Sequence, residues 1–112
     1  MSKLRYHALT TTLLVLAGTA FAQSERLEEG RLAFEKHCVE CHENTSAEAP
    51  TARDKSDWAS RSQLWEAVLF EHAEKGYLEM PPKGGAEDAT SYEVEAAAEY
   101  MLTVTHPDMP HD

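Results

Sequence analysis

The feature that most constrains this chain is the run Cys38-Val39-Glu40-Cys41-His42, which contains both of its cysteines. Two thiols three positions apart on a helical turn can both reach the vinyl edge of one porphyrin ring. The histidine that follows is then held beneath the ring, where an imidazole nitrogen can ligate iron. The spacing therefore predicts one covalently attached haem c, bound through Cys38 and Cys41, with His42 as an axial iron ligand.

The motif has other interpretations. A thioredoxin-like redox pair would belong to a βαβ unit, and the sequence lacks the strand pattern of such a unit. A zinc site would need further ligands at suitable spacing, which the chain does not offer. Chance is the remaining alternative, because the pattern is short. Haem is favoured by the signs of export and the long loops described below.

The N-terminus has the pattern of a secretory signal peptide. Two basic residues precede a short, mostly apolar run from Ala8 to Ala17, and Ala20-Phe21-Ala22 places small residues where a signal peptidase cuts. The apolar run is well short of the roughly 20 residues that cross a bilayer. We expect residues 1–22 to be removed by cleavage after about Ala22, which leaves a periplasmic protein without stable membrane insertion. A buried N-terminal helix of the fold is the alternative.

The mature domain, residues 23–112, is small and strongly acidic. The whole chain has 20 acidic and 10 basic residues, a formal charge of −10, and loss of Lys3 and Arg5 takes this to −12. Such a domain does not suit nucleic acid, whose phosphates need a basic surface. We expect a monomer that docks transiently with redox partner proteins. Glu40 and Glu43 are candidates for steering a partner, although a solvated acidic face is the more ordinary explanation.

Hydrophobic periodicity predicts an all-α domain with three main helices. They are expected over about Glu25–Lys36, Arg61–Lys75 and Ser91–Thr103. The connections between them, Glu43–Ala59 and Tyr77–Ala89, are long for so small a domain, and such loops usually have a function. Each loop could cover one face of a flat ligand.

Local signals refine the helix ends. Capping boxes at Ser60/Gln63 and Thr90/Glu93 would start the second and third helices, and Gly76 would end the second. The residues expected on the inner faces are Leu27, Gly30, Arg31 and Phe34 in the first helix, Leu64, Trp65, Val68, Leu69 and His72 in the second, and Val94, Ala97, Ala98, Met101 and Leu102 in the third.

Met80 is the predicted second axial ligand. It begins the irregular segment Met80-Pro81-Pro82-Lys83-Gly84-Gly85, where a thioether can be aimed rather than packed and where prolines reduce the entropy lost on ordering. Methionine opposite histidine raises the reduction potential. A gap-filling methionine is the alternative, with His72 and His37 as rival ligands. The remaining rivals, in a polar tail expected from about residue 104, are His106, Met109 and His111.

Together these residues resemble the class I c-type cytochromes, closest to the short bacterial cytochrome c-five group. The resemblance covers roughly Arg26 to Thr103. It implies a small cytochrome c fold, with helices and loops wrapped around one covalent haem, and the function of an electron carrier rather than an enzyme. Its specific elements are Gly30 and Phe34, the Cys38–His42 motif, Pro50, the segment Met80–Gly84, and Tyr100.

The resemblance also implies how the helices pack. Gly30 would let the first and last helices cross closely, with Phe34 and Tyr100 beside the crossing. In one respect the chain departs from the group, whose members often carry a second cysteine pair after the methionine loop. Here Gly85–Ala89 contains no sulfur, so we expect a less constrained Met80 loop whose iron–sulfur band is lost on heating before the protein unfolds.

Around the haem, the resemblance assigns further contacts. The Pro50 carbonyl would accept the outward N–H of His42, which would fix the ring and raise its basicity; a simple turn residue is the alternative. Trp58 and Arg61 are candidates for contacts with the haem propionates, although a surface pair of these two residues is nearly as good an explanation.

The sequence thus predicts a periplasmic monohaem cytochrome that shuttles single electrons through a His/Met-ligated iron. One alternative is a haem-based ligand-binding or enzymatic module with a displaceable Met80, which would take up carbon monoxide promptly. Another is an electron-transfer subunit of a larger complex, which would not be stable alone.

Overall fold

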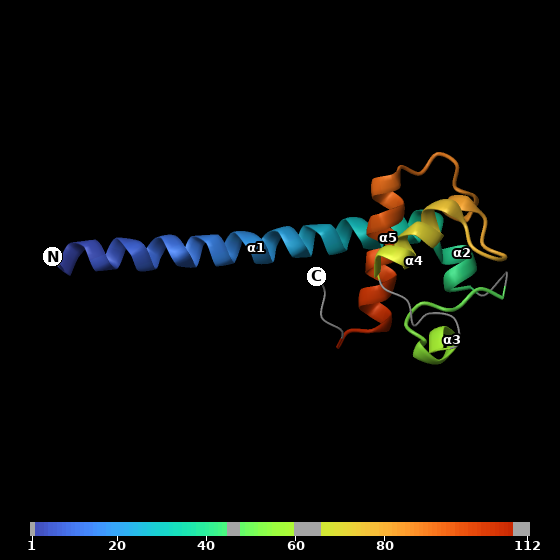
Figure 1. Ribbon diagram of the computed structural model, residues 1–112, viewed down its shortest axis with the longest axis horizontal. Coiled ribbons are helices and arrows are strands. Elements are labelled where there is room, and N and C mark those ends of the chain that lie inside the picture. The colour runs from blue at the N-terminus through green and yellow to red at the C-terminus, as the bar shows by residue number, and fades with distance from the viewer. Residues whose placement is uncertain (1, 45–47, 60–65, 109–112) are drawn as a thin grey trace.

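The computed structural model describes residues 2–44, 48–59 and 66–108, and within them the chain is all-α. This part of the chain has no strand, only an isolated bridge between Tyr77 and Met80. Figure 1 shows α5 crossing the C-terminal part of α1, whose N-terminal part projects away from the other helices. The helices are α1 (Ser2–His37), α2 (Val39–His42), α3 (Lys55–Ala59), α4 (Glu66–Lys75) and α5 (Ser91–Thr105), with a short 3-10 helix, η1 (Pro82–Gly85).

The crossing of α1 and α5 depends on Gly30. A Cβ atom at this position would lie 2.3 Å from the carbonyl oxygen of Ala96, so no larger residue fits without separating the helices. Beside the crossing, the Phe34 and Tyr100 rings pack at 5.4 Å between centroids with a 49° tilt. Phe34 is only 1 % exposed and is the centre of the core. The close crossing that the family resemblance implied is confirmed.

The buried face of α1 differs from the predicted one. Ala33 is buried together with Gly30 and Phe34, whereas Leu27 is 39 % exposed. Arg31 forms ion pairs with glutamates one turn away on either side, at the surface. The reason is that α5 crosses α1 rather than running beside it, so its cover is limited to the residues nearest the crossing.

The predicted start of α5 and end of α4 are both confirmed. The Thr90 hydroxyl accepts from the Glu93 backbone N–H at 3.1 Å, and the Glu93 carboxylate accepts from the Thr90 backbone N–H at 2.9 Å. This reciprocal pair is a capping box. Gly76 follows the last residue of α4 with φ +85°, a conformation that favours glycine. The other predicted capping box, Ser60/Gln63, lies outside the described residues.

The last helix is longer than predicted and reaches Thr105. Val104 packs against the core, and Thr105 is 3 % exposed and accepts a hydrogen bond from the Arg53 backbone N–H at 3.0 Å. A polar tail therefore cannot begin at 104. The fully buried face of α5 consists of Val94, Ala96, Ala97, Tyr100, Met101 and Thr105, while Ala98 and Leu102 are half-buried.

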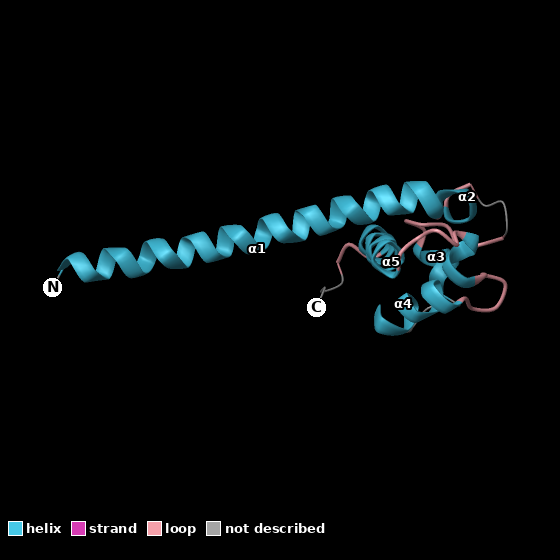
Figure 2. Ribbon diagram, turned by 90° about the horizontal axis from the view of Figure 1, so that it is seen from above, coloured by secondary structure: helices cyan, strands magenta, loops and turns pink. Residues whose placement is uncertain are grey.

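The two predicted long connections contain local structure. The first includes α3, which the sequence pattern did not predict, and the second includes η1, where Lys83 and Gly84 have φ of 56° and 64° and so interrupt a regular helix. Seen from above, α5 lies between α1 and α4 (Figure 2). In the described part of the chain, none of the helices is both long and apolar enough to cross a membrane.

Candidate metal centre

The two cysteines and the histidine of the motif lie on one helical turn that directly follows α1. The Cys38 backbone N–H donates to the Phe34 carbonyl at 2.8 Å, and the His42 N–H donates to the Cys38 carbonyl at 3.0 Å. The turn is thus an extension of the helix that carries the core residue Phe34. Cys38 and Cys41 are free thiols, each half-buried. Burial raises the pKa of the Cys38 thiol to about 11, with the neighbouring Cys41 adding to the rise.

His42 is held by a backbone carbonyl. The side chain is buried, and its Nδ1 lies 2.9 Å from the Pro50 carbonyl oxygen. Burial lowers the pKa of His42 below its ordinary value, and the bond to Pro50 only partly opposes this shift. The neutral ring that results donates through Nδ1–H, so Nε2 carries the lone pair that can bind a metal.

The segment after Pro50 closes around the same histidine. The Ala52 N–H donates to the His42 carbonyl at 2.7 Å. Trp58 donates its indole N–H to the Thr51 carbonyl at 3.0 Å, and its ring lies nearly parallel to the His42 imidazole, at 17° and 6.0 Å between centroids. The indole has a single N–H, so a propionate contact by Trp58 would compete with the bond to Thr51. We therefore assign Trp58 to the surroundings of His42. Arg61, the other residue expected at a propionate, lies outside the described residues.

Arg53 connects this segment to α5 and was not predicted as a site residue. Its backbone N–H donates to the Thr105 hydroxyl, and its guanidinium donates to the Tyr100 hydroxyl at 2.7 Å and to Glu43 at 2.8 Å. Arg53 has φ +70°, which is uncommon for a residue with a side chain. The only indication in the sequence that Arg53 is a site residue is its position three residues after Pro50.

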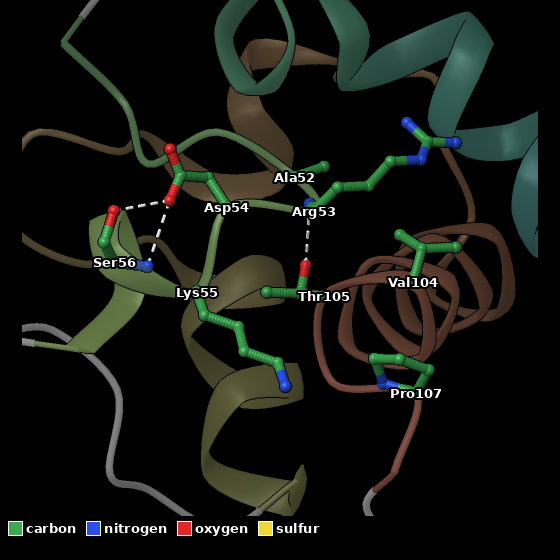
Figure 3. A pocket seen from close by; sticks show the side chains of 8 residues that line it. All are labelled: Ala52, Arg53, Asp54, Lys55, Ser56, Val104, Thr105 and Pro107. Atoms are coloured by element: carbon green, nitrogen blue, oxygen red, sulfur yellow. Dashed lines mark hydrogen bonds between the residues drawn. The ribbon is translucent and has the colours of Figure 1, made fainter.

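A concavity that Arg53 helps to line is shown in Figure 3, and its other lining residues come from the segment 52–56, from the end of α5 and from Pro107. Neither the two cysteines nor His42 nor Met80 lines it. The hollow is open to solvent. The Arg53 guanidinium bonds to Tyr100 and Glu43, which do not line it. We assign it no role in the metal centre.

Met80 lies in a tightly folded segment after α4. Its backbone N–H donates to the Tyr77 carbonyl at 3.0 Å, and its carbonyl accepts from the Tyr77 N–H at 2.9 Å. The chain comes so close at Gly76 that an added Cβ there would lie 2.8 Å from the Pro82 nitrogen and 2.9 Å from the Met80 carbonyl oxygen. Met80 is half-buried, and a Cβ at Gly84 would lie 3.8 Å from its Cε.

The rival ligands are placed as follows. His72 stacks on Tyr77, at 3.8 Å between ring centroids and 5° between planes. The His37 side chain is 9 % exposed, and its Nε2 lies 3.9 Å from the Glu93 carboxylate without a hydrogen-bond partner in the described part of the chain. His106 is half-buried at the end of α5. Met109 and His111 lie outside the described residues.

The donor groups fit covalently attached haem. Thiols at Cys38 and Cys41 can form thioethers with vinyl groups, and a neutral imidazole with an anchored Nδ1 is suited to ligate iron. A thioether at Met80 is a soft donor that suits the same metal. Among the described residues, no three His, Cys, Asp or Glu side chains gather into a metal site.

Comparison with known proteins points the same way. Residues 25–101 match the family described as cytochrome c oxidase, cbb3-type, subunit III. Cytochrome c-555 of Chlorobaculum tepidum is 32 % identical over 106 residues, which cover 91 % of this chain and 96 % of the relative. Cytochrome c-555 of Chlorobaculum thiosulfatiphilum is 31 % identical over 65 % of this chain and 90 % of the relative. Cytochrome c-555 of Prosthecochloris aestuarii is 30 % identical over 68 % of this chain and 85 % of the relative.

Proposed function

The chain belongs to the class I c-type cytochromes, electron carriers with covalently attached haem c, and we propose that it shuttles single electrons in the periplasm with His42 and Met80 as axial ligands. The observation that carries this proposal is the anchored ring of His42, the residue directly after the second cysteine. Its Nδ1 is bonded to the Pro50 carbonyl. When bound, the haem supplies an iron that gains and loses one electron.

The chain's own residues account for efficient transfer. His42 is held through its ring and its carbonyl, and Met80 is held through paired backbone bonds with Tyr77. Ligands that are already fixed move little when the charge on the metal changes, so the energy spent on reorganisation is small. If His42 and Met80 both ligate the iron, no position would be open for a substrate, which agrees with an electron carrier rather than an enzyme.

Covalent attachment and export support each other. We propose that residues 1–22 are the secretory signal, that cleavage after about Ala22 releases residues 23–112 as the cytochrome domain, and that this domain works in the periplasm. The described helix α1 runs without a break through the proposed cleavage point. Mass spectrometry of protein recovered from the periplasm would give the first residue of the mature chain, and an N-terminus far from residue 23 would contradict this part of the proposal.

The partner is expected to be a basic redox protein that docks briefly. The domain has a large excess of acids, and steering by charge raises association rates without requiring a tight interface. Of the two glutamates singled out for steering, Glu43 is exposed but forms an ion pair with Arg53, which partly neutralises it. Steering by the whole acidic surface is therefore a better expectation than steering by Glu43 alone.

The decisive experiment is an absorption spectrum, from the visible into the far red, of the oxidised protein produced with haem-attachment machinery. A c-type spectrum with a far-red sulfur-to-iron band is expected, and Met80→Ala should remove this band while the c-type spectrum remains. A c-type spectrum without the band in the unmodified protein would remove Met80 as a ligand. Prompt carbon monoxide uptake by the ferrous protein would favour a ligand-binding module instead.

One observation favours a second candidate, an electron-transfer subunit of a larger complex. The matching family is described as a subunit of a cbb3-type oxidase. Against this, the match to cytochrome c-555 of Chlorobaculum tepidum covers nearly all of both chains. Size measurement of the purified holoprotein separates the two: a stable monomer supports the shuttle, whereas a chain that is stable only with other subunits supports the second candidate.

A further inference from the structure

The ring stack at the end of α4 joins a helix to the segment that carries Met80. The His72 and Tyr77 rings lie face to face, with 3.8 Å between centroids and 5° between planes. His72 is on the last turns of α4, and Tyr77 comes directly after the glycine that ends this helix. The chain therefore turns back after Gly76 and lays the Tyr77 ring against its own helix.

Tyr77 in turn fixes the backbone of Met80. Its N–H and carbonyl both bond to the backbone of Met80, at 2.9 and 3.0 Å, so residues 77–80 form a closed turn. The approach of Gly76 to Met80 and Pro82 leaves this turn little room to shift. The Tyr77 and Met80 backbones are therefore coupled, so a stack that holds Tyr77 against α4 limits how far Met80 can move.

The rest of the loop is held by a second link to α4. The Lys83 ammonium donates to the Ala89 carbonyl at 2.8 Å and lies 3.8 Å from the Glu74 carboxylate. This link is an ion pair at partial exposure, which contributes little. Of the stack and this ion pair, the stack is the one placed next to Met80.

We propose that His72 is a positioning residue for Met80, acting through Tyr77, and that this stack braces the loop in which no second cysteine pair exists. The proposal rests on the proposed His/Met ligation. It gives His72 a role other than that of rival ligand, because its imidazole is engaged face to face with a phenol ring. The energetic scale is that of an aromatic pair, which changes an equilibrium by roughly 2- to 10-fold.

The test compares variants of the holoprotein with free imidazole as a probe that competes with Met80 for ferric iron. His72→Ala removes the ring and should raise the apparent imidazole affinity by about 2- to 10-fold, and it should lower the temperature at which the far-red band is lost. His72→Phe keeps a flat ring and should restore both values most of the way. Helix melting, followed by circular dichroism, should change less than loss of the band.

Glu71→Ala is the matched control, because Glu71 neighbours His72 on α4, forms its ion pair with Lys75 at the surface, and takes no part in the ring stack. It should leave imidazole affinity unchanged. Tyr77→Leu removes the stack from the other side and serves if His72→Ala folds poorly. The double variant His72→Ala/Tyr77→Leu should bind imidazole no more tightly than Tyr77→Leu alone, since both changes remove the same interaction.

The outcomes separate the two proposals. If the unmodified protein has no far-red band, the ligand assignment fails and the positioning role fails with it. If the band is present but His72→Ala and Glu71→Ala bind imidazole equally, the positioning role is overturned and His/Met ligation stands. A full additive effect in the double variant would also overturn it, because the two rings would then act separately.

Discussion

His42 lies in a part of the chain that is bonded to the α1–α5 core, whereas Met80 lies in a loop that is bonded mainly to itself and to α4. On the His42 side, Pro50 holds the ring and Arg53 links the segment to Tyr100 of α5. On the Met80 side, the bonds join residues only a few positions apart. His42 is 8 % exposed, and Met80 is half-buried.

Because of this difference, we expect the two proposed ligands to be lost in different ways. Loss of the His42 side requires the core to open, because its anchors are residues far apart in the sequence. Loss of the Met80 side requires only a local opening, and such openings cost less than global unfolding. We therefore expect heating of the oxidised protein to remove the far-red band before the helices melt.

The largest effect is expected from Phe34→Ala, which damages the α1–α5 core to which the His42 side is bonded. Phe34 is 1 % exposed and packs on Tyr100, so its truncation leaves a cavity in the core. The free energy of unfolding should fall by about 3–5 kcal/mol. Denaturant titrations followed by circular dichroism would measure it. A fall of well under half this size would show that the core is not centred on Phe34.

Gly76→Ala should increase the difference between the temperature at which the far-red band is lost and the temperature at which the helices melt. The new Cβ would meet Pro82 and the Met80 carbonyl, and φ is +85°, so the local cost is expected to be about 1–3 kcal/mol. The far-red band should be lost at a clearly lower temperature, while helix melting shifts less. Gly85→Ala is the control, since Gly85 has φ +86° but nothing within 4 Å of a new Cβ. Equal effects of the two changes would show that backbone strain, not collision with Met80, is responsible.

Arg53→Met should reduce this temperature difference by destabilising the His42 side. It removes the bond to the Tyr100 hydroxyl and the link to Glu43 while the aliphatic stem is kept. Because the Arg53 side chain is about half exposed, the expected loss is only about 1 kcal/mol of unfolding free energy. The midpoint of helix melting should fall towards that of the far-red band. A shift in the band alone would contradict the assignment of Arg53 to the His42 side.

Thr90→Ala is expected to have the smallest effect, about 0.5 kcal/mol, because Thr90 is exposed and only one half of the capping box of α5 is removed. Hydrogen bonds from Thr90 lower the pKa of Glu93 below its ordinary value of 4.5. The box therefore contributes fully above pH 4.5 and loses its carboxylate as the pH falls through the lowered value. Stabilities of both proteins at pH 7 and in acid should show their difference shrinking in acid; a constant difference would contradict this.

The sequence predicted what depends on short spacing. The capping box of α5 and the stop at Gly76 each involve one conformational demand that a residue type reveals. The close crossing of Gly30 and Ala96 was instead implied by the family resemblance. The direction of burial on α1 was less accessible, because Leu27 is exposed only through the angle at which α5 crosses. A periodic pattern contains no information about that angle.

The contacts around the candidate ligands show the same limit. That Trp58 donates to Thr51, and that Arg53 reaches Tyr100, depends on how an irregular segment folds against a helix distant in sequence. The absence of a second cysteine pair after Met80 indicated a weaker brace, yet the stack of His72 on Tyr77 holds the same loop from its other end. A histidine five residues before a tyrosine does not predict a ring stack, because the two rings meet only if the glycine between them turns the chain.

The crossing at Gly30 also bears on the order in which the protein is assembled. It needs Ala96 of α5, the last described helix, whereas Cys38 follows Gly30 by only about two helical turns. A chain that enters the periplasm from its N-terminus delivers both thiols before Ala96 can meet Gly30. In the folded chain these thiols are half-buried and Cys38 is hard to ionise. On the proposed route of export, haem attachment would therefore take place before the helices cross.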